Sequence, residues 1–244
     1  MNASGTSMRF GPPFFPDVIK GLLIANIAVY LLQKLLPIQT QFGLMLTPAA
    51  FWGEGALWQI FTYMWLHSSG SIWHLVFNML ALWMFGSDVA AHWGTRRFLR
   101  FYLLCGVGAG LIIAGWPALL LGFQVETASW FLPTVGASGA IYGVLLAHSL
   151  LFPNRTILLI FPPIPLRAIY LIPFLFLMEL LAGDPGVSHA GHIGGVLVGW
   201  LLLWRAGEAR GLSLSRLRWH YRRWRMRRNL RAVRMEDRRR GGFH

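Results

Sequence analysis

The sequence predicts an all-α membrane protein, a bundle of six transmembrane helices with both termini in the cytoplasm. Of its 244 residues, 55% are hydrophobic and only 13% are charged, and the mean hydropathy is +0.51. A soluble domain carries about 25% charged residues, so this composition argues against an ordinary soluble protein. The other two observations are a set of long apolar stretches and an uneven distribution of Arg and Lys between the loops that join them.

Six apolar stretches are long enough, or nearly so, to cross a bilayer core of about 30 Å, which needs roughly 17 to 25 helical residues. They cover residues 18–37, 72–91, 98–116, 136–153, 166–182 and 189–204. The last stretch is short, which suggests that its polar beginning lies within the membrane. Residues 56–66 are apolar and aromatic but too short to cross, and are typical of a membrane interface. The chain therefore divides into an N-terminal segment 1–17, a six-helix body 18–204 and a tail 205–244.

The positive charges orient the bundle, because cytoplasmic loops retain Lys and Arg. Of the net charge of +13, the tail supplies +11 from 14 Arg and three acidic residues. The loops after the second and fourth spans also carry Arg. Both termini are therefore expected in the cytoplasm, in a multi-pass integral protein of a bacterial plasma membrane. Directly after a span, the Arg- and Trp-rich tail favours anionic lipid over nucleic acid as its partner.

With this topology the second, fourth and sixth spans all begin at the outer face, so the polar residues at their beginnings share one depth. These residues are His74 and Asn78, Ser138 and Tyr142, and His189 and His192. Glycines at four-residue spacing let the fourth and sixth spans pack closely, which would bring Ser138 to a histidine. A serine within reach of a histidine is the minimal arrangement for an activated nucleophile.

No Asp or Glu is expected at this depth on these spans, since Asp88 lies near the cytoplasmic end of the second span and Glu179 is on the fifth. The pattern therefore predicts a Ser-His dyad rather than a triad, with no metal and no cofactor. Two alternatives remain at this point. The polar residues could pack without chemistry, or His74, His189 and His192 could be ligands in a metal or ion transporter.

The combined motifs resemble those of the rhomboid intramembrane serine proteases. The motifs are His74-x-x-x-Asn78, Gly136-x-Ser138-Gly139 and Ala190-Gly191-His192-Ile193-Gly194-Gly195. The resemblance implies that Ser138 is the nucleophile and His192 the general base. It implies that His74, Asn78 and the backbone N–H of Ser138 stabilise the oxyanion, and that Tyr142 packs on the catalytic ring. The expected substrates are transmembrane segments of other membrane proteins.

Some features remain open under this resemblance. Many family members have a Trp-Arg pair in the first loop, whereas this chain has Trp58-Gln59, which puts the packing of that loop in doubt. His189 is expected as a polar residue at a water-filled entrance. The fifth span, with Pro173 and the loop 183–187, is the candidate for a lateral substrate gate. A catalytically inactive relative that binds transmembrane segments is a further alternative.

Overall fold

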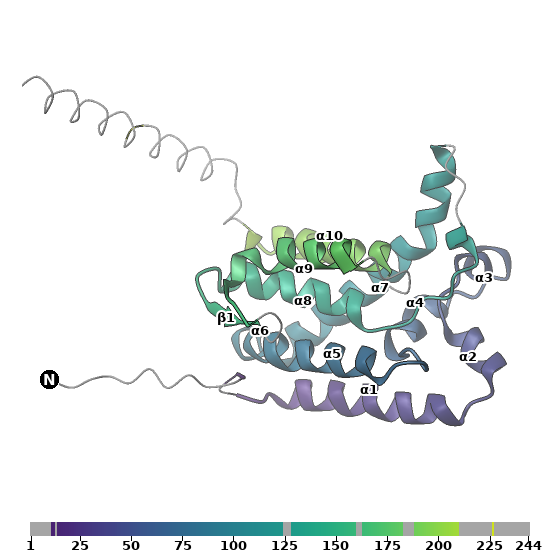
Figure 1. Ribbon diagram of the computed structural model, residues 1–244, viewed down its shortest axis with the longest axis horizontal. Coiled ribbons are helices and arrows are strands. Elements are labelled where there is room, and N and C mark those ends of the chain that lie inside the picture. The colour runs from purple at the N-terminus through teal and green to yellow at the C-terminus, as the bar shows by residue number, and fades with distance from the viewer. Residues whose placement is uncertain are drawn as a thin grey trace, which may run out of the picture. The chain divides into compact units, whose positions relative to one another are not determined.

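The computed structural model describes residues 11–12, 14–123, 128–159, 163–182, 188–209 and 226. The chain divides into two units, Met1–Leu203 and Trp204–His244. The first unit is mostly helical, as predicted (Figure 1). Most of the basic tail, most of the N-terminal segment and the expected gate loop 183–187 lie outside the described residues, so the expectations for them stay predictions.

Three helical stretches in the described part of the chain are long and apolar enough to cross a membrane. They are α1 (Asp17–Leu35), the stretch Ile72–Trp93 formed by α5 (Ile72–Ala81), the π-helical turn η2 (Leu82–Gly86) and α6 (Ser87–Trp93), and α7 (Thr95–Gly122). The shorter apolar helices are α8 (Ser138–Leu151), α9 (Leu171–Ala182), which follows the 3-10 turn η4 (Ala168–Tyr170), and α10 (His189–Arg205). Each of the six predicted spans is therefore helical over most of its length. The number of crossings and the cytoplasmic termini stay predictions.

Large apolar side chains are exposed on the outside of these helices. Ile24 and Leu31 on α1 are 66% and 60% exposed, and Phe77 on α5 and Leu104 on α7 are 61% and 52% exposed. Soluble monomers rarely expose contiguous apolar surface on this scale, whereas lipid tails would cover it. The exposed apolar surface marks the chain as a membrane protein.

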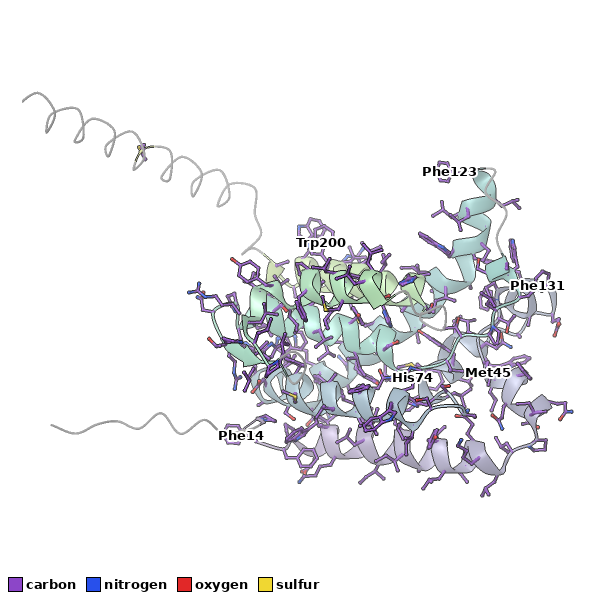
Figure 2. The ribbon with its side chains drawn as sticks, viewed as in Figure 1. Phe14, Met45, His74, Phe123, Phe131 and Trp200 are labelled. Carbon is purple, nitrogen blue, oxygen red and sulfur yellow. The ribbon has the colours of Figure 1, made fainter. Side chains whose placement is uncertain are left out.

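The third predicted span is longer than expected. α7 continues to Gly122 instead of ending at Trp116, and Pro117 lies inside it. This last part of the helix projects beyond the neighbouring helices and carries Phe123, 74% exposed, at its end (Figure 2).

α8 is the central helix of the bundle, because ten of its 14 residues are buried. Glycines bring α10 against it, as predicted. A Cβ built on Gly195 would lie only 1.9 Å from the carbonyl oxygen of Gly139, and one on Gly199 would lie 3.0 Å from the Cα of Gly143. These two helices therefore touch backbone to backbone, which fixes their relative register.

The segment between α1 and α5 forms short helices. They are α2 (Ile38–Leu44), α3 (Pro48–Gly53), α4 (Gln59–Thr62) and the 3-10 turn η1 (Tyr63–Trp65). Gln59, at the position where an arginine is usual, is 2% exposed. Its amide oxygen accepts the backbone N–H of Thr47 at 3.0 Å, and its amide nitrogen donates to the carbonyl oxygen of Gly43 at 3.3 Å. Gln59 therefore ties this loop together with neutral hydrogen bonds.

A small sheet departs from the all-helical expectation. β1 (Thr156–Leu158) and β2 (Pro165–Arg167) pair as an antiparallel hairpin between α8 and α9. The first two residues of the predicted fifth span, Leu166 and Arg167, therefore belong to a strand. Arg155, beside this hairpin, binds the carboxylate of Asp88 at 2.6 Å, and that carboxylate also lies 3.2 Å from the ring of His148. Asp88 thus joins α6 to the far end of α8, which is a structural role.

Candidate active site

Ser138 is the first residue of α8, and the bend before it depends on glycine. Gly136 has a φ of +126°, a conformation that side chains rarely adopt. Its N–H donates to the carbonyl oxygen of Tyr63 at 3.0 Å, which holds the bend against η1. Because a helix begins here, the first backbone N–H groups of α8 have no partner within the helix and make its start electropositive.

His192 of α10 reaches Ser138. Its Nε2 lies 2.9 Å from the Ser138 Oγ, and its side chain is 12% exposed. The ring of Tyr142 stacks on the ring of His192, with centroids 4.1 Å apart and an interplanar angle of 13°. Tyr142 lies one helical turn after Ser138. Helix α8 therefore supplies both the Ser138 hydroxyl and the Tyr142 ring that packs flat against the His192 ring. The structure thus brings Ser138, His192 and Tyr142 together, and their catalytic roles stay predictions.

His74 lies at the beginning of α5, beside the bend that leads into Ser138 (Figure 2). Its Nδ1 accepts the backbone N–H of Ser68 at 3.2 Å. Since a backbone N–H can only donate, the proton of the neutral ring is on Nε2. A Cβ built on Gly136 would lie 2.8 Å from this Nε2 and 3.7 Å from the Ser138 Oγ. The donor of His74 and the hydroxyl of Ser138 therefore lie on the same side of Gly136.

Asn78 is buried one turn after His74 on α5. Its amide nitrogen donates to the His74 carbonyl oxygen at 2.7 Å. This bond uses one of the two amide hydrogens and fixes the orientation of the side chain. The Asn78 side chain is therefore held against the backbone of His74, on the same side of the site.

The predicted dyad included no acidic side chain in contact with the histidine, and the structure places one there. Glu179 of α9 places its Oε2 2.9 Å from the Nδ1 of His192, and the Tyr142 hydroxyl donates to the same oxygen at 3.0 Å. The other carboxylate oxygen is bound by the Nδ1 of His189. The polar residues predicted to share this depth all lie on helices that start at the outer face. A helix that runs the opposite way ends at that face, so the same topology would have placed the end of the fifth span, and Glu179, at this depth.

His67 is a second residue beside the site that was not predicted from the sequence. It is fully buried in the loop before α5, and its ring lies 5.3 Å from that of His74, measured between centroids. Among the described residues neither of its ring nitrogens has a hydrogen-bond partner. Burial, with a smaller effect of the nearby His74, lowers the pKa of His67 to about 4 from its usual 6.5. The ring is therefore neutral at neutral pH.

The structure also bears on the transporter alternative. Within the residues that the structure describes, no three His, Cys, Asp or Glu side chains are placed to hold a metal ion. His189 and His192 are instead bound to one carboxylate.

The sequence compares with known proteins as the motifs predict. A sequence model of the Rhomboid domain matches residues 54–209. The chain is 34% identical to Rhomboid protein 1, mitochondrial, of Saccharomyces cerevisiae over 147 residues, which cover 58% of this chain and 40% of that protein. It is 29% identical to Rhomboid protease AarA of Providencia stuartii over 199 residues, which cover 74% of this chain and 69% of that protein.

The structure shows a helical membrane protein that brings Ser138, His192 and His74 to one site, and the sequence match shows its family. The chain belongs to the rhomboid family. The aligned regions span 40% of the yeast protein and 56% of RHOMBOID-like protein 12, mitochondrial, of Arabidopsis thaliana, which is 28% identical over 191 residues.

Proposed function

We propose that this protein is an intramembrane serine endopeptidase that cleaves transmembrane segments of other membrane proteins. The single observation that carries the proposal is the 2.9 Å contact between the Ser138 Oγ and the His192 Nε2. Membership of the rhomboid family and the relative named as a protease support it.

The first half of the reaction forms an acyl-enzyme. The Ser138 Oγ attacks the peptide carbonyl carbon while His192 Nε2 takes the hydroxyl proton. When the tetrahedral intermediate collapses, His192 returns that proton to the leaving amine nitrogen, and the C–N bond breaks. The substrate's carbonyl carbon is then bound to Ser138 as an ester.

The second half repeats the chemistry with water. His192 removes a proton from water, the resulting hydroxide attacks the ester, and the proton goes back to the Ser138 Oγ. The negative oxygen of both tetrahedral intermediates faces the Nε2–H of His74 and the first N–H groups of α8. An oxyanion donor of this kind contributes about 3 to 4 kcal/mol in soluble proteases.

The length of α8 suits a reaction inside the membrane. A 14-residue helix rises about 21 Å, less than the hydrocarbon core of about 30 Å. With its C-terminal end at the cytoplasmic face, α8 begins below the outer surface, so Ser138 meets a substrate within the bilayer. A peptide bond in an intact helix is shielded, so substrates with Gly or Pro near the cut, which unwind easily, should be preferred.

The proposal extends to the surroundings of the enzyme. A bacterial plasma membrane remains the predicted location, and the relatives named above include mitochondrial proteins and one from Providencia stuartii. The basic tail 205–244 would lie on anionic cytoplasmic lipid, each basic residue adding about 1 kcal/mol. Salt-sensitive loss of liposome binding by a peptide of residues 205–244 would support the lipid contact, and tight binding of that peptide only to RNA would contradict it.

The test is cleavage of a transmembrane reporter by the purified protein in liposomes. Ser138→Ala and His192→Ala should each reduce kcat by about 10³-fold or more. The matched control is Ser149→Ala, because Ser149 is a buried serine of the same helix whose hydroxyl donates to the carbonyl oxygen of Leu145. The control should keep turnover within about twofold of the wild type. Wild-type turnover in Ser138→Ala or His192→Ala would refute the proposal.

A further inference from the structure

Three donors converge on the carboxylate of Glu179. The Nδ1 of His192 and the hydroxyl of Tyr142 share Oε2, while the Nδ1 of His189 binds Oε1. The Glu179 side chain is only 8% exposed. An ionisable group inside a membrane helix is costly unless it is paired, and here both carboxylate oxygens are occupied from two neighbouring helices.

The carboxylate fixes which nitrogen of His192 carries the proton. An ionised carboxylate only accepts hydrogen bonds, so the Nδ1 of His192 must be the protonated nitrogen. That leaves a lone pair on Nε2, which is the atom that faces the hydroxyl of Ser138. The tautomer that can accept the serine proton is therefore the one that Glu179 selects.

We propose that Glu179 is the positioning residue of His192, so that the site works as a Ser138–His192–Glu179 relay of hydrogen bonds rather than as a dyad. This inference rests on the proposed protease function. When the Nε2 of His192 takes the proton from Ser138, the ring becomes a cation. The adjacent carboxylate stabilises this cation at the moment it forms.

His189 and Tyr142 hold the carboxylate in place from opposite sides. His189 lies one helical turn before His192 on α10, and its side chain is 58% exposed, so it covers Glu179 toward the outside. Tyr142 approaches from α8 and also stacks on the His192 ring. The carboxylate is thus fixed by both helices that carry the reacting groups.

The test compares two replacements of Glu179 in the full-length protein in liposomes. Glu179→Gln keeps the size and an oxygen that can accept the Nδ1–H but removes the charge, whereas Glu179→Leu removes both. We expect kcat to fall about 10- to 100-fold in Glu179→Gln and about 10³-fold in Glu179→Leu, with KM within about threefold of the wild type in both. Glu54→Gln, the same change at an exposed position, is the matched control and should behave as the wild type.

The outcomes separate this inference from the proposed function. If Ser138→Ala is inactive but both Glu179 variants keep the wild-type kcat, Glu179 does not position His192 and the dyad stands. The inference also fails if the loss in the Glu179 variants falls on KM alone, since that indicates a role in substrate entry. If Ser138→Ala itself remains active, the proposed function fails. Should Glu179→Leu not fold, Glu179→Gln decides, since its kcat must fall at an unchanged melting temperature.

Discussion

Replacing Gly195 by Ala tests the helix contact on which the whole site depends. A Cβ at this position would lie 1.9 Å from the carbonyl oxygen of Gly139. The clash is with backbone, so no side chain can rotate away to relieve it. Gly139 follows the nucleophile directly, and Gly195 lies one turn after His192. If α8 and α10 move apart at Gly139 and Gly195, the Ser138 and His192 side chains therefore move apart as well.

The size of the effect follows from the distances. Restoring an ordinary contact requires α8 and α10 to move apart by roughly 1.5 Å. The contact between the Ser138 Oγ and the His192 Nε2 would lengthen from 2.9 Å to about 4.4 Å, beyond hydrogen-bond range. A misplacement of this size costs about 100-fold in rate, and overpacking of the interface costs about 1 to 3 kcal/mol in stability.

The assay measures kcat on the transmembrane reporter together with the free energy of unfolding in detergent. Gly115→Ala is the matched control, because Gly115 lies in α7 and a Cβ there meets nothing within 4 Å. The control should keep full activity and gain up to about 1 kcal/mol in stability from the better helix former. If Gly195→Ala has wild-type kcat and stability, the backbone contact between α8 and α10 is not as described.

Two further predictions concern the loops around the site. Burial lowers the pKa of His67 to about 4. As the pH falls, the His67 ring is therefore protonated in the unfolded chain before it is protonated in the folded protein. About 2 kcal/mol of the free energy of unfolding should be lost between about pH 8 and about pH 5. His67→Phe should remove this part of the pH dependence in unfolding titrations, whereas the same change at the exposed His92 should leave it in place; an unchanged pH dependence in His67→Phe would show that the buried ring is not its source. Gln59→Leu should reduce the free energy of unfolding by about 1 to 3 kcal/mol, because the backbone N–H of Thr47 loses its partner while the Gly43 carbonyl oxygen keeps only the Trp58 indole N–H. A stability equal to the wild type's would show that the Gln59 bonds contribute nothing.

The helices of the body could be predicted because apolar length is a local property of the sequence. The stretches 18–37 and 72–91 correspond closely to α1 and to Ile72–Trp93. The hairpin β1–β2 could not be predicted in the same way. Its strands have three residues each and sit next to apolar helix-like sequence, so no alternation of apolar and polar residues distinguishes them.

Part of the site could be predicted, because its residues lie at helical spacing on spans that all start at the outer face. Four-residue spacing places Ser138 and Tyr142 on one helix face, and the glycine faces bring a histidine of the last span to Ser138. The choice of His192 over His189 comes from the rhomboid resemblance. Glu179 was missed because it approaches from a helix of the opposite direction, so its relation to His192 depends on the packing of α9 rather than on any spacing in the sequence. His67 lies in a loop, and nothing in the sequence around it indicates that the ring is buried.

The most direct test of the central claim is to find where a fluorophosphonate binds to the folded protein. The reagent reacts only with an activated serine, and peptide mapping locates the modified residue. We expect a single adduct on Ser138, absent in Ser138→Ala and formed at least about 100-fold more slowly in His192→Ala. No adduct on Ser138, or an adduct that forms equally fast without His192, would contradict the account of this site as a histidine-activated serine nucleophile.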